Sequence, residues 1–142
     1  MEYRKTNVVE RTFNQLFGLL VRLGIGLPHN FLLQVRGRRT GRVYSTPVNV
    51  LKHSGRRFLV APRGDTQWSR NALASGEVTL VKGFRRSTVK VRPVADEAKP
   101  EILKAYLDRF TLTVQRYFPV RAGSPVDQFR PLAARYPVFE IL

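Results

Sequence analysis

The pattern of apolar and polar positions predicts short strands with helices before, between and after them. From Val9 to Leu23, apolar residues recur at spacings of three and four, which predicts an amphipathic helix. This segment is too short and too interrupted to span a bilayer. We expect its apolar face to pack on its own domain, and the alternative is that the helix lies on a membrane surface with its cationic residues against anionic lipid.

Apolar runs bounded by turn residues predict six strands. They cover residues 30–35, 48–51, 57–61, 78–81, 86–94 and 138–142. The first three strands follow one another on short connections, which indicates an antiparallel meander. The fifth strand alternates apolar and polar side chains, a half-buried pattern. Between the third and fourth strands, Thr66 can cap a short helix over residues 67–74 that ends at Ser75 and Gly76.

Helical spacing returns after the fifth strand. Asp96 is the expected N-cap, Pro100 lies in or near the first turn, and helical character extends to Tyr117. Residues 127–135 predict one more helix before the last strand. We therefore expect one α+β domain over residues 1–142, with a helical segment at 1–28 and, at 29–142, a barrel-like sheet of about six mostly antiparallel strands with peripheral helices.

Composition narrows the chemistry. The chain of 142 residues is 43% hydrophobic, which excludes a disordered protein. It contains no cysteine, and its two histidines, His29 and His53, lack the spacing of metal ligands, so no metal site is predicted. A net charge of +15 indicates an anionic partner such as nucleic acid, a membrane surface or an acidic ligand. Arginine-rich codon usage would produce the same excess, so charge alone does not identify the partner.

The most distinctive stretch is the connection between the first two strands. Residues 36–42 read Arg-Gly-Arg-Arg-Thr-Gly-Arg, with four arginines and two glycines. Glycine permits tight turns and close approach of a ligand, and the arginine fork binds phosphate or carboxylate at two points. We interpret this stretch as an anion-binding hairpin tip. The alternative is a solvated surface turn, as for most isolated charge runs.

The common catalytic constellations are missing from the sequence. It has no Cys–His pair, no Gly-x-Ser-x-Gly elbow, no Walker loop and no Gly-x-Gly-x-x-Gly motif. Asp65 and Glu77 are the only acidic residues between Glu10 and Asp96, so paired-carboxylate chemistry is disfavoured. Such a chain is either not an enzyme or an enzyme whose reactive group is a borrowed cofactor.

Two segments together suggest such a cofactor. Residues 38–42 and Ser45-Thr46-Pro47 form the first, and residues 61–64 with the Trp68-x-x-Asn71 helix form the second. Their combined pattern resembles the deazaflavin-dependent nitroreductase family of split β-barrel oxidoreductases, over about residues 31–94. The resemblance implies a split β-barrel reductase that uses reduced coenzyme F-420, an 8-hydroxy-5-deazaflavin with a phosphate and an oligoglutamate tail. It would transfer hydride to an electron-poor acceptor such as a quinone, an activated ene-carbonyl or a nitroaromatic.

By the same resemblance, Arg39 contacts the anionic tail and Arg63 lies near the phosphate. The backbone of Pro47 and Val48 lies against the deazaflavin ring. The full set of cofactor-binding residues implied is Arg38, Arg39, Thr40, Gly41, Arg42, Thr46, Pro47, Val48, Ala61, Pro62, Arg63, Trp68 and Asn71.

The remaining expectations concern the acceptor and the partners. The resemblance implies that C-terminal aromatics line the acceptor pocket, with Tyr117 and Phe118 as the best candidates. No catalytic residue is assigned, but Tyr44 and Tyr117 are candidates for a tyrosine that supplies the proton if water does not. The resemblance also suggests a homodimer. We expect a cytoplasmic protein, with peripheral membrane binding through its first helix as the alternative.

Two alternative functions stay open from the residues. The same fold could bind FMN, FAD or haem instead of F-420. A nucleic-acid-binding barrel is less favoured, because the exposed aromatics do not interleave with the basic turns.

Overall fold

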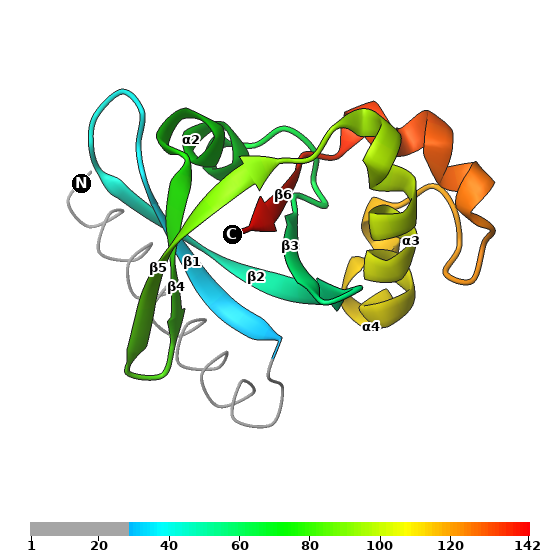
Figure 1. Cartoon of the computed structure of the whole chain (residues 1–142), viewed down its shortest axis with the longest axis horizontal. Coiled ribbons are helices and arrows are strands. Elements are labelled where there is room, and N and C mark those ends of the chain that lie inside the picture. Colours follow the sequence, from blue (N-terminus) through cyan, green and yellow to red (C-terminus); the bar gives the residue numbers. More distant parts are fainter. Residues whose placement is uncertain (1–28) are drawn as a thin grey trace, which may run out of the picture.

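The computed structural model describes residues 29–142, which form a closed six-stranded barrel with helices packed against it (Figure 1). All pairings are antiparallel, in the order β1-β2-β3-β6-β5-β4, and β4 pairs back onto β1. The strands are β1 (Asn30–Arg36), β2 (Val43–His53), β3 (Arg56–Val60), β4 (Glu77–Lys82), β5 (Arg85–Pro93) and β6 (Val138–Ile141). This confirms the predicted α+β barrel of about six antiparallel strands. The helix predicted over residues 9–23, and the membrane contact suggested for it, lie outside the described residues.

Two long strands change partners along their length, which makes the barrel a split one. β2 pairs with β1 from Val43 to Asn49 and with β3 from Val50 onward. β5 likewise pairs with β4 up to Lys90 and with β6 from Val91. The predicted second strand, at 48–51, therefore began too late, because the preceding residues pair with β1 even though they do not show a clear apolar alternation.

The turns and the inserted helix follow the sequence signals closely. Ser54 and Gly55 both have positive φ (51° and 75°), as a two-residue hairpin between β2 and β3 requires. Helix α2 (Gln67–Ser75) has Thr66 as its N-cap residue and ends at Gly76, whose φ of 73° is left-handed. The predicted helix is confirmed to within one residue.

Apolar side chains form two cores on opposite faces of the sheet. Inside the barrel, Leu59 and Val50 pack with residues of β1, β4, β5, β6 and α2. Outside, Phe58 and Val60 pack against the C-terminal helices. Since neighbouring residues of a strand point to opposite faces, β3 is buried on both sides. The sequence accordingly shows a continuous apolar run there rather than an alternation.

The C-terminal helical layer covers the outer core. It consists of η1 (Asp96–Ala98), α3 (Lys99–Arg109), α4 (Thr111–Val114), η2 (Gln115–Tyr117) and η3 (Val126–Arg135), where η marks 3-10 helix. The predicted N-cap at Asp96 is wrong, because a 3-10 turn precedes α3 and makes Ala98 the N-cap residue. The Asp96 carboxylate instead lies 2.8 Å from the Lys99 ammonium. Within residues 29–142, no helix is long and apolar enough to cross a membrane.

Candidate cofactor site

The arginine-rich connection forms the tip of the β1–β2 hairpin and projects beyond the barrel next to α2 (Figure 1). The Gly37 N–H donates to the Arg42 carbonyl at 2.6 Å, and the Gly41 N–H donates to the Gly37 carbonyl at 3.1 Å. Both glycines are required by this turn. Gly41 has a φ of 74°, and a Cβ on Gly37 would lie 2.7 Å from the Tyr44 ring.

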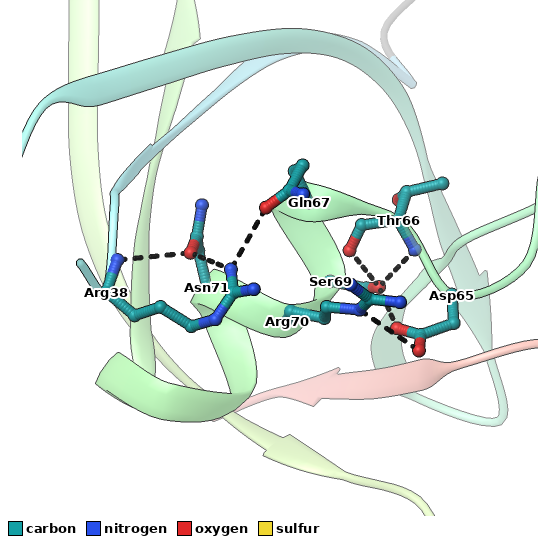
Figure 2. A network of polar contacts seen from close by, with 7 residues as sticks. All are labelled: Arg38, Asp65, Thr66, Gln67, Ser69, Arg70 and Asn71. Atoms are coloured by element: carbon teal, nitrogen blue, oxygen red, sulfur yellow. Dashed lines mark hydrogen bonds and ion pairs between the residues drawn. The ribbon is translucent and has the colours of Figure 1, made fainter. Parts of the chain in front are cut away.

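One arginine of the tip anchors the hairpin to α2. The Arg38 backbone N–H donates to the Asn71 side-chain oxygen at 3.1 Å, and the Arg38 guanidinium donates to the same oxygen at 2.8 Å and to Gln67 at 3.1 Å (Figure 2). Asn71 is almost fully buried, at 2% exposure. The structure therefore gives Arg38 and Asn71, both expected to contact the cofactor, a structural role in holding the tip in place.

Two other arginines of the tip are available to a ligand. The side chains of Arg39 and Arg42 are exposed and form no hydrogen bond or ion pair with any of residues 29–142. Arg36 differs, because its guanidinium donates to the Gly41 carbonyl at 3.0 Å. The acid on the loop before α2, Asp65, is engaged by Arg70 at 3.1 Å (Figure 2). The tip therefore presents two uncompensated guanidinium groups to solvent.

The neighbouring part of β2 has one free edge. Residues 43–49 pair only with β1 among the described strands, since β3 joins β2 at Val50. The Val50 N–H donates to the His29 carbonyl on the β1 side. Backbone groups of a strand point alternately to its two sides, so the N–H and C=O of Ser45 and the C=O of Pro47 face away from β1. This direction explains how Pro47, which has no N–H, fits within a paired strand.

The loop after β3 brings the second basic segment to the C-terminal helices. Ala61 is buried and donates its N–H to the Pro137 carbonyl at 2.9 Å, and Gly64 turns the chain with a φ of 89°. The Arg63 guanidinium carbon lies 5.8 Å from the centre of the Tyr117 ring. Arg63 and Tyr117, distant in sequence, are thus brought together.

Tyr117 is fixed in this position by two further contacts. The Arg116 guanidinium lies 4.8 Å from its ring centre and donates to its hydroxyl oxygen at 2.7 Å. The Tyr136 hydroxyl donates to the Tyr117 backbone carbonyl. Tyr117 therefore presents a hydroxyl polarised by a guanidinium next to the Arg63 loop.

Two predicted site aromatics have mainly packing roles. Phe118, predicted to line the acceptor pocket, is buried and stacks on Tyr136 with ring centres 4.6 Å apart. Its position next to a loop suggested exposure, but the chain turns its ring into the outer core. Trp68 is half-buried and packs at the end of the inner core, 6.0 Å from the Phe139 ring.

Sequence reasoning missed two residues of this region. Gln67 lies four positions before Asn71, so both face the hairpin from one side of α2. That spacing was a usable signal. Arg116 had no such signal, because its contact with the Tyr117 hydroxyl depends on the local 3-10 turn.

A separate hollow lies elsewhere on the surface of the described residues. It measures about 340 Å³ and opens where β1 and β4 diverge, with Gln34, Glu77 and Arg86 in its lining. Arg86 donates to Gln34 at 2.7 Å, so its polar groups are partly engaged with each other. Among residues 29–142, no three His, Cys, Asp or Glu side chains are grouped to hold a metal ion.

Comparison with known proteins decides the class. A family model described as F-420H(2)-dependent quinone reductase matches residues 3–120 of the chain. The chain belongs to this family. It is a reductase that uses coenzyme F-420, as the sequence resemblance indicated.

Solved structures agree on the fold at low sequence identity. An F-420-H2 dependent reductase (FDR-A) is 16% identical, with a TM-score of 0.53 over 80% of this chain and 94% of that one. A structure described as a domain-swapped dimer is 14% identical, with a TM-score of 0.53 over 97% and 99%. An FAD-binding protein from Mesorhizobium loti is 11% identical, with a TM-score of 0.52 over 80% of each chain. No curated protein matches the chain.

The donor set of this reductase fits a polyanionic cofactor with a planar ring. Arg39 and Arg42 supply unpaired guanidinium groups for phosphate or carboxylate. The free edge of β2 supplies a backbone donor and two acceptors at Ser45 and Pro47 for the polar rim of a ring.

Proposed function

We propose that the reductase binds reduced F-420 along the free edge of β2, between the arginine hairpin and the Arg63 loop. The acceptor reduced there is an electron-poor planar molecule, such as a quinone, an activated ene-carbonyl or a nitroaromatic. The observation that carries the proposal is the pair of uncompensated guanidiniums, Arg39 and Arg42, beside a strand edge with unpaired backbone groups. When bound, the cofactor supplies the hydride.

In this proposal, arginine side chains bind the anionic groups of the cofactor and backbone groups of β2 bind its ring. Arg39 and Arg42 hold the carboxylates of the oligoglutamate tail, and Arg63 holds the phosphate. Ser45 and Pro47 orient the ring through backbone hydrogen bonds, which do not depend on side-chain rotamers. Arg38 and Asn71 do not contact the cofactor in this proposal. They fix the hairpin so that the free arginines are already in position, which lowers the entropy lost on binding.

Tyr117 is the proposed proton donor to the reduced acceptor. Its hydroxyl oxygen accepts a hydrogen bond from Arg116, so its own proton stays available to a substrate. The nearby guanidiniums of Arg63 and Arg116 also favour the negative charge that develops on a quinone or nitro oxygen during reduction. Tyr44 is the second candidate. It is 43% exposed and its ring lies against Gly37, at the base of the arginine hairpin.

A homodimer is part of the proposal but does not depend on the site. One of the similar structures is described as a domain-swapped dimer. Light scattering coupled to size-exclusion chromatography measures the mass of the particle directly. A mass of one chain at all concentrations would contradict the dimer and leave the cofactor site unaffected.

The test is a parallel titration of the purified full chain with reduced F-420 and with FMN. We expect F-420 to bind with a change in its absorbance, and to be oxidised when menadione, a nitroaromatic or an ene-carbonyl is added. Comparing initial rates with the three acceptors identifies the acceptor class. FMN binding without F-420 binding would overturn the proposed site chemistry, and F-420 binding without oxidation by any of the three would overturn the acceptor class.

A further inference from the structure

The tip of the β4–β5 hairpin carries an aromatic side chain that the fold does not use. Gly83 and Phe84 connect the paired residues Lys82 and Arg85, and Gly83 has a φ of 60°. The positive φ of Gly83 makes the turn, so the turn needs no aromatic residue after it. Phe84 is fully exposed, at 108%, and belongs to neither core.

The charged residues that flank Phe84 in the sequence are all positive. Lys82 and Arg85 lie directly opposite each other in the ladder, where like charges disfavour pairing. Arg86 follows, and its hydrogen-bond partner, Gln34, is neutral. The sequence has no acidic residue between Glu77 and Asp96. The Lys82 ammonium donates to the Asn30 carbonyl at 3.0 Å, so the cations beside the exposed ring are Arg85 and Arg86.

The β4–β5 hairpin also extends beyond the body of the barrel. Its outer half projects from the barrel, away from the C-terminal helices (Figure 1). The outer part of β5, from Arg85 to Thr88, is exposed throughout and pairs only with β4 among the described strands. The half-buried pattern predicted for this strand holds only at its inner end, where Val89 is half-buried and Val91 is buried. Within residues 29–142, the tip is therefore open to contact with a flat surface.

We propose that this tip docks on an anionic lipid bilayer, with Phe84 inserted at the headgroup level and Arg85 and Arg86 against lipid phosphates. Burial of an apolar ring at the headgroup–acyl boundary is favourable, and cations near an anionic leaflet are attracted to it. A tip-to-tip contact with a second copy is the less suitable partner, because it would bring Arg85 and Arg86 of both copies together. Single-stranded nucleic acid is also less suitable, since a single ring on a projecting tip provides no basic groove to follow the strand.

The test measures partition of the full-length protein onto phosphatidylcholine vesicles with and without phosphatidylglycerol, in the absence of cofactor and acceptor. We expect binding only to the anionic vesicles. Phe84→Ser should lower the partition coefficient about tenfold, from the apolar burial lost, and Arg85→Gln roughly fivefold, from the charge lost. Leu112→Ser is the matched control, because Leu112 is equally exposed (102%) but lies on α4. It should change nothing.

Two further readouts separate docking from folding and from the proposed reductase site. Phe84→Ser should keep the melting temperature and the F-420 affinity, since Phe84 touches neither core and lies outside the cofactor site. Phe84→Trp should show a blue-shifted emission on anionic vesicles, against the unchanged background of Trp68.

Three results would overturn the proposal. The first is that wild type and Phe84→Ser bind the anionic vesicles equally, or that neither binds. The second is that Leu112→Ser loses as much binding as Phe84→Ser. The third is that Phe84→Ser abolishes a lipid-free dimer or a complex with an oligonucleotide. None of these results bears on F-420 oxidation, so the two proposals fail independently.

Discussion

Replacing two adjacent arginines of the hairpin tip separates binding from folding. Arg39 is exposed and has no partner among residues 29–142, whereas Arg38 makes three hydrogen bonds to α2. Arg39→Ala should therefore weaken F-420 binding with little change in stability. Arg38→Ala should lower stability first, because it removes two guanidinium hydrogen bonds and leaves the backbone N–H as the only link to Asn71.

The magnitudes follow from exposure. An exposed ion pair contributes about 1 kcal/mol at most, while a charge-assisted hydrogen bond contributes about 1.5–3 kcal/mol. Loss of the Arg39 contact with a carboxylate tail should then raise the dissociation constant about tenfold, and the melting temperature should stay within about 1–2 °C, since surface changes cost at most about 0.5 kcal/mol. For Arg38→Ala, two partly solvated hydrogen bonds are worth about 1–2 kcal/mol. This corresponds to a fall in melting temperature of about 3–6 °C for a domain of this size.

The assays are F-420 titration by absorbance and thermal denaturation followed by circular dichroism, on both variants and on Arg39→Lys. Lysine keeps the charge but not the two-point fork, so Arg39→Lys should recover part of the affinity. Raising the salt concentration should weaken wild-type binding more than binding by Arg39→Ala, because one screened contact is missing from the variant. Our assignment of the two arginines is refuted if Arg39→Ala binds F-420 as tightly as wild type while Arg38→Ala loses affinity at an unchanged melting temperature. In that case Arg38 would bind the cofactor and Arg39 would not.

The other predictions concern residues that support the barrel and the proposed proton donor. Tyr136→Phe removes the hydroxyl that donates to the Tyr117 carbonyl and should cost about 1 kcal/mol of unfolding free energy; it should slow acceptor reduction more than it weakens F-420 binding, and equal effects on both would argue against Tyr117 as proton donor. Gly76→Ala should cost about 1 kcal/mol in denaturant unfolding, because a φ of 73° strains alanine although its Cβ would meet nothing within 4 Å; an unchanged midpoint would contradict this account of the α2 terminus. Hydrogen bonding and the charges of Arg92 and Arg56 lower the pKa of Glu140, so its contribution to stability is present above the unfolded-state value near 4.5 and is lost as pH falls through the lowered native pKa. Glu140→Gln should therefore lower the melting temperature at pH 7 and converge with wild type in acid, and a constant difference between the two at every pH would refute the assignment.

Local signals in the sequence predicted the elements well wherever a turn or a cap dictates the backbone. The Ser54–Gly55 turn, the Thr66 to Gly76 limits of α2 and the helical spacing over Ile102–Phe110 all depend on neighbours within a few residues. The start of β2 was missed for the opposite reason. Residues 43–47 are extended because β1 pairs with them, and no local pattern reports that pairing.

The cofactor site likewise has features that the sequence predicts and features that only tertiary contacts show. The arginine and glycine content of the hairpin indicated an anion-binding turn, and the paired motifs indicated the F-420-dependent family. The sequence treated its arginines as one cluster, however. Tertiary contacts separate them, since Asn71 and Gln67 of α2 engage Arg38 and leave Arg39 free.

The sequence by itself determined the type and order of most secondary elements in residues 29–142, the basic character of the two turns and the family. These are properties of local propensity, composition and motif spacing. Tertiary structure alone decided which edge of β2 pairs with no other described strand, and that Tyr117 meets Arg63 while Phe118 turns into the core. It also decided that Phe84 projects without a partner among the described residues. Each of these depends on which distant segments pack against one another, and burial and pairing across the chain are settled only when the barrel closes.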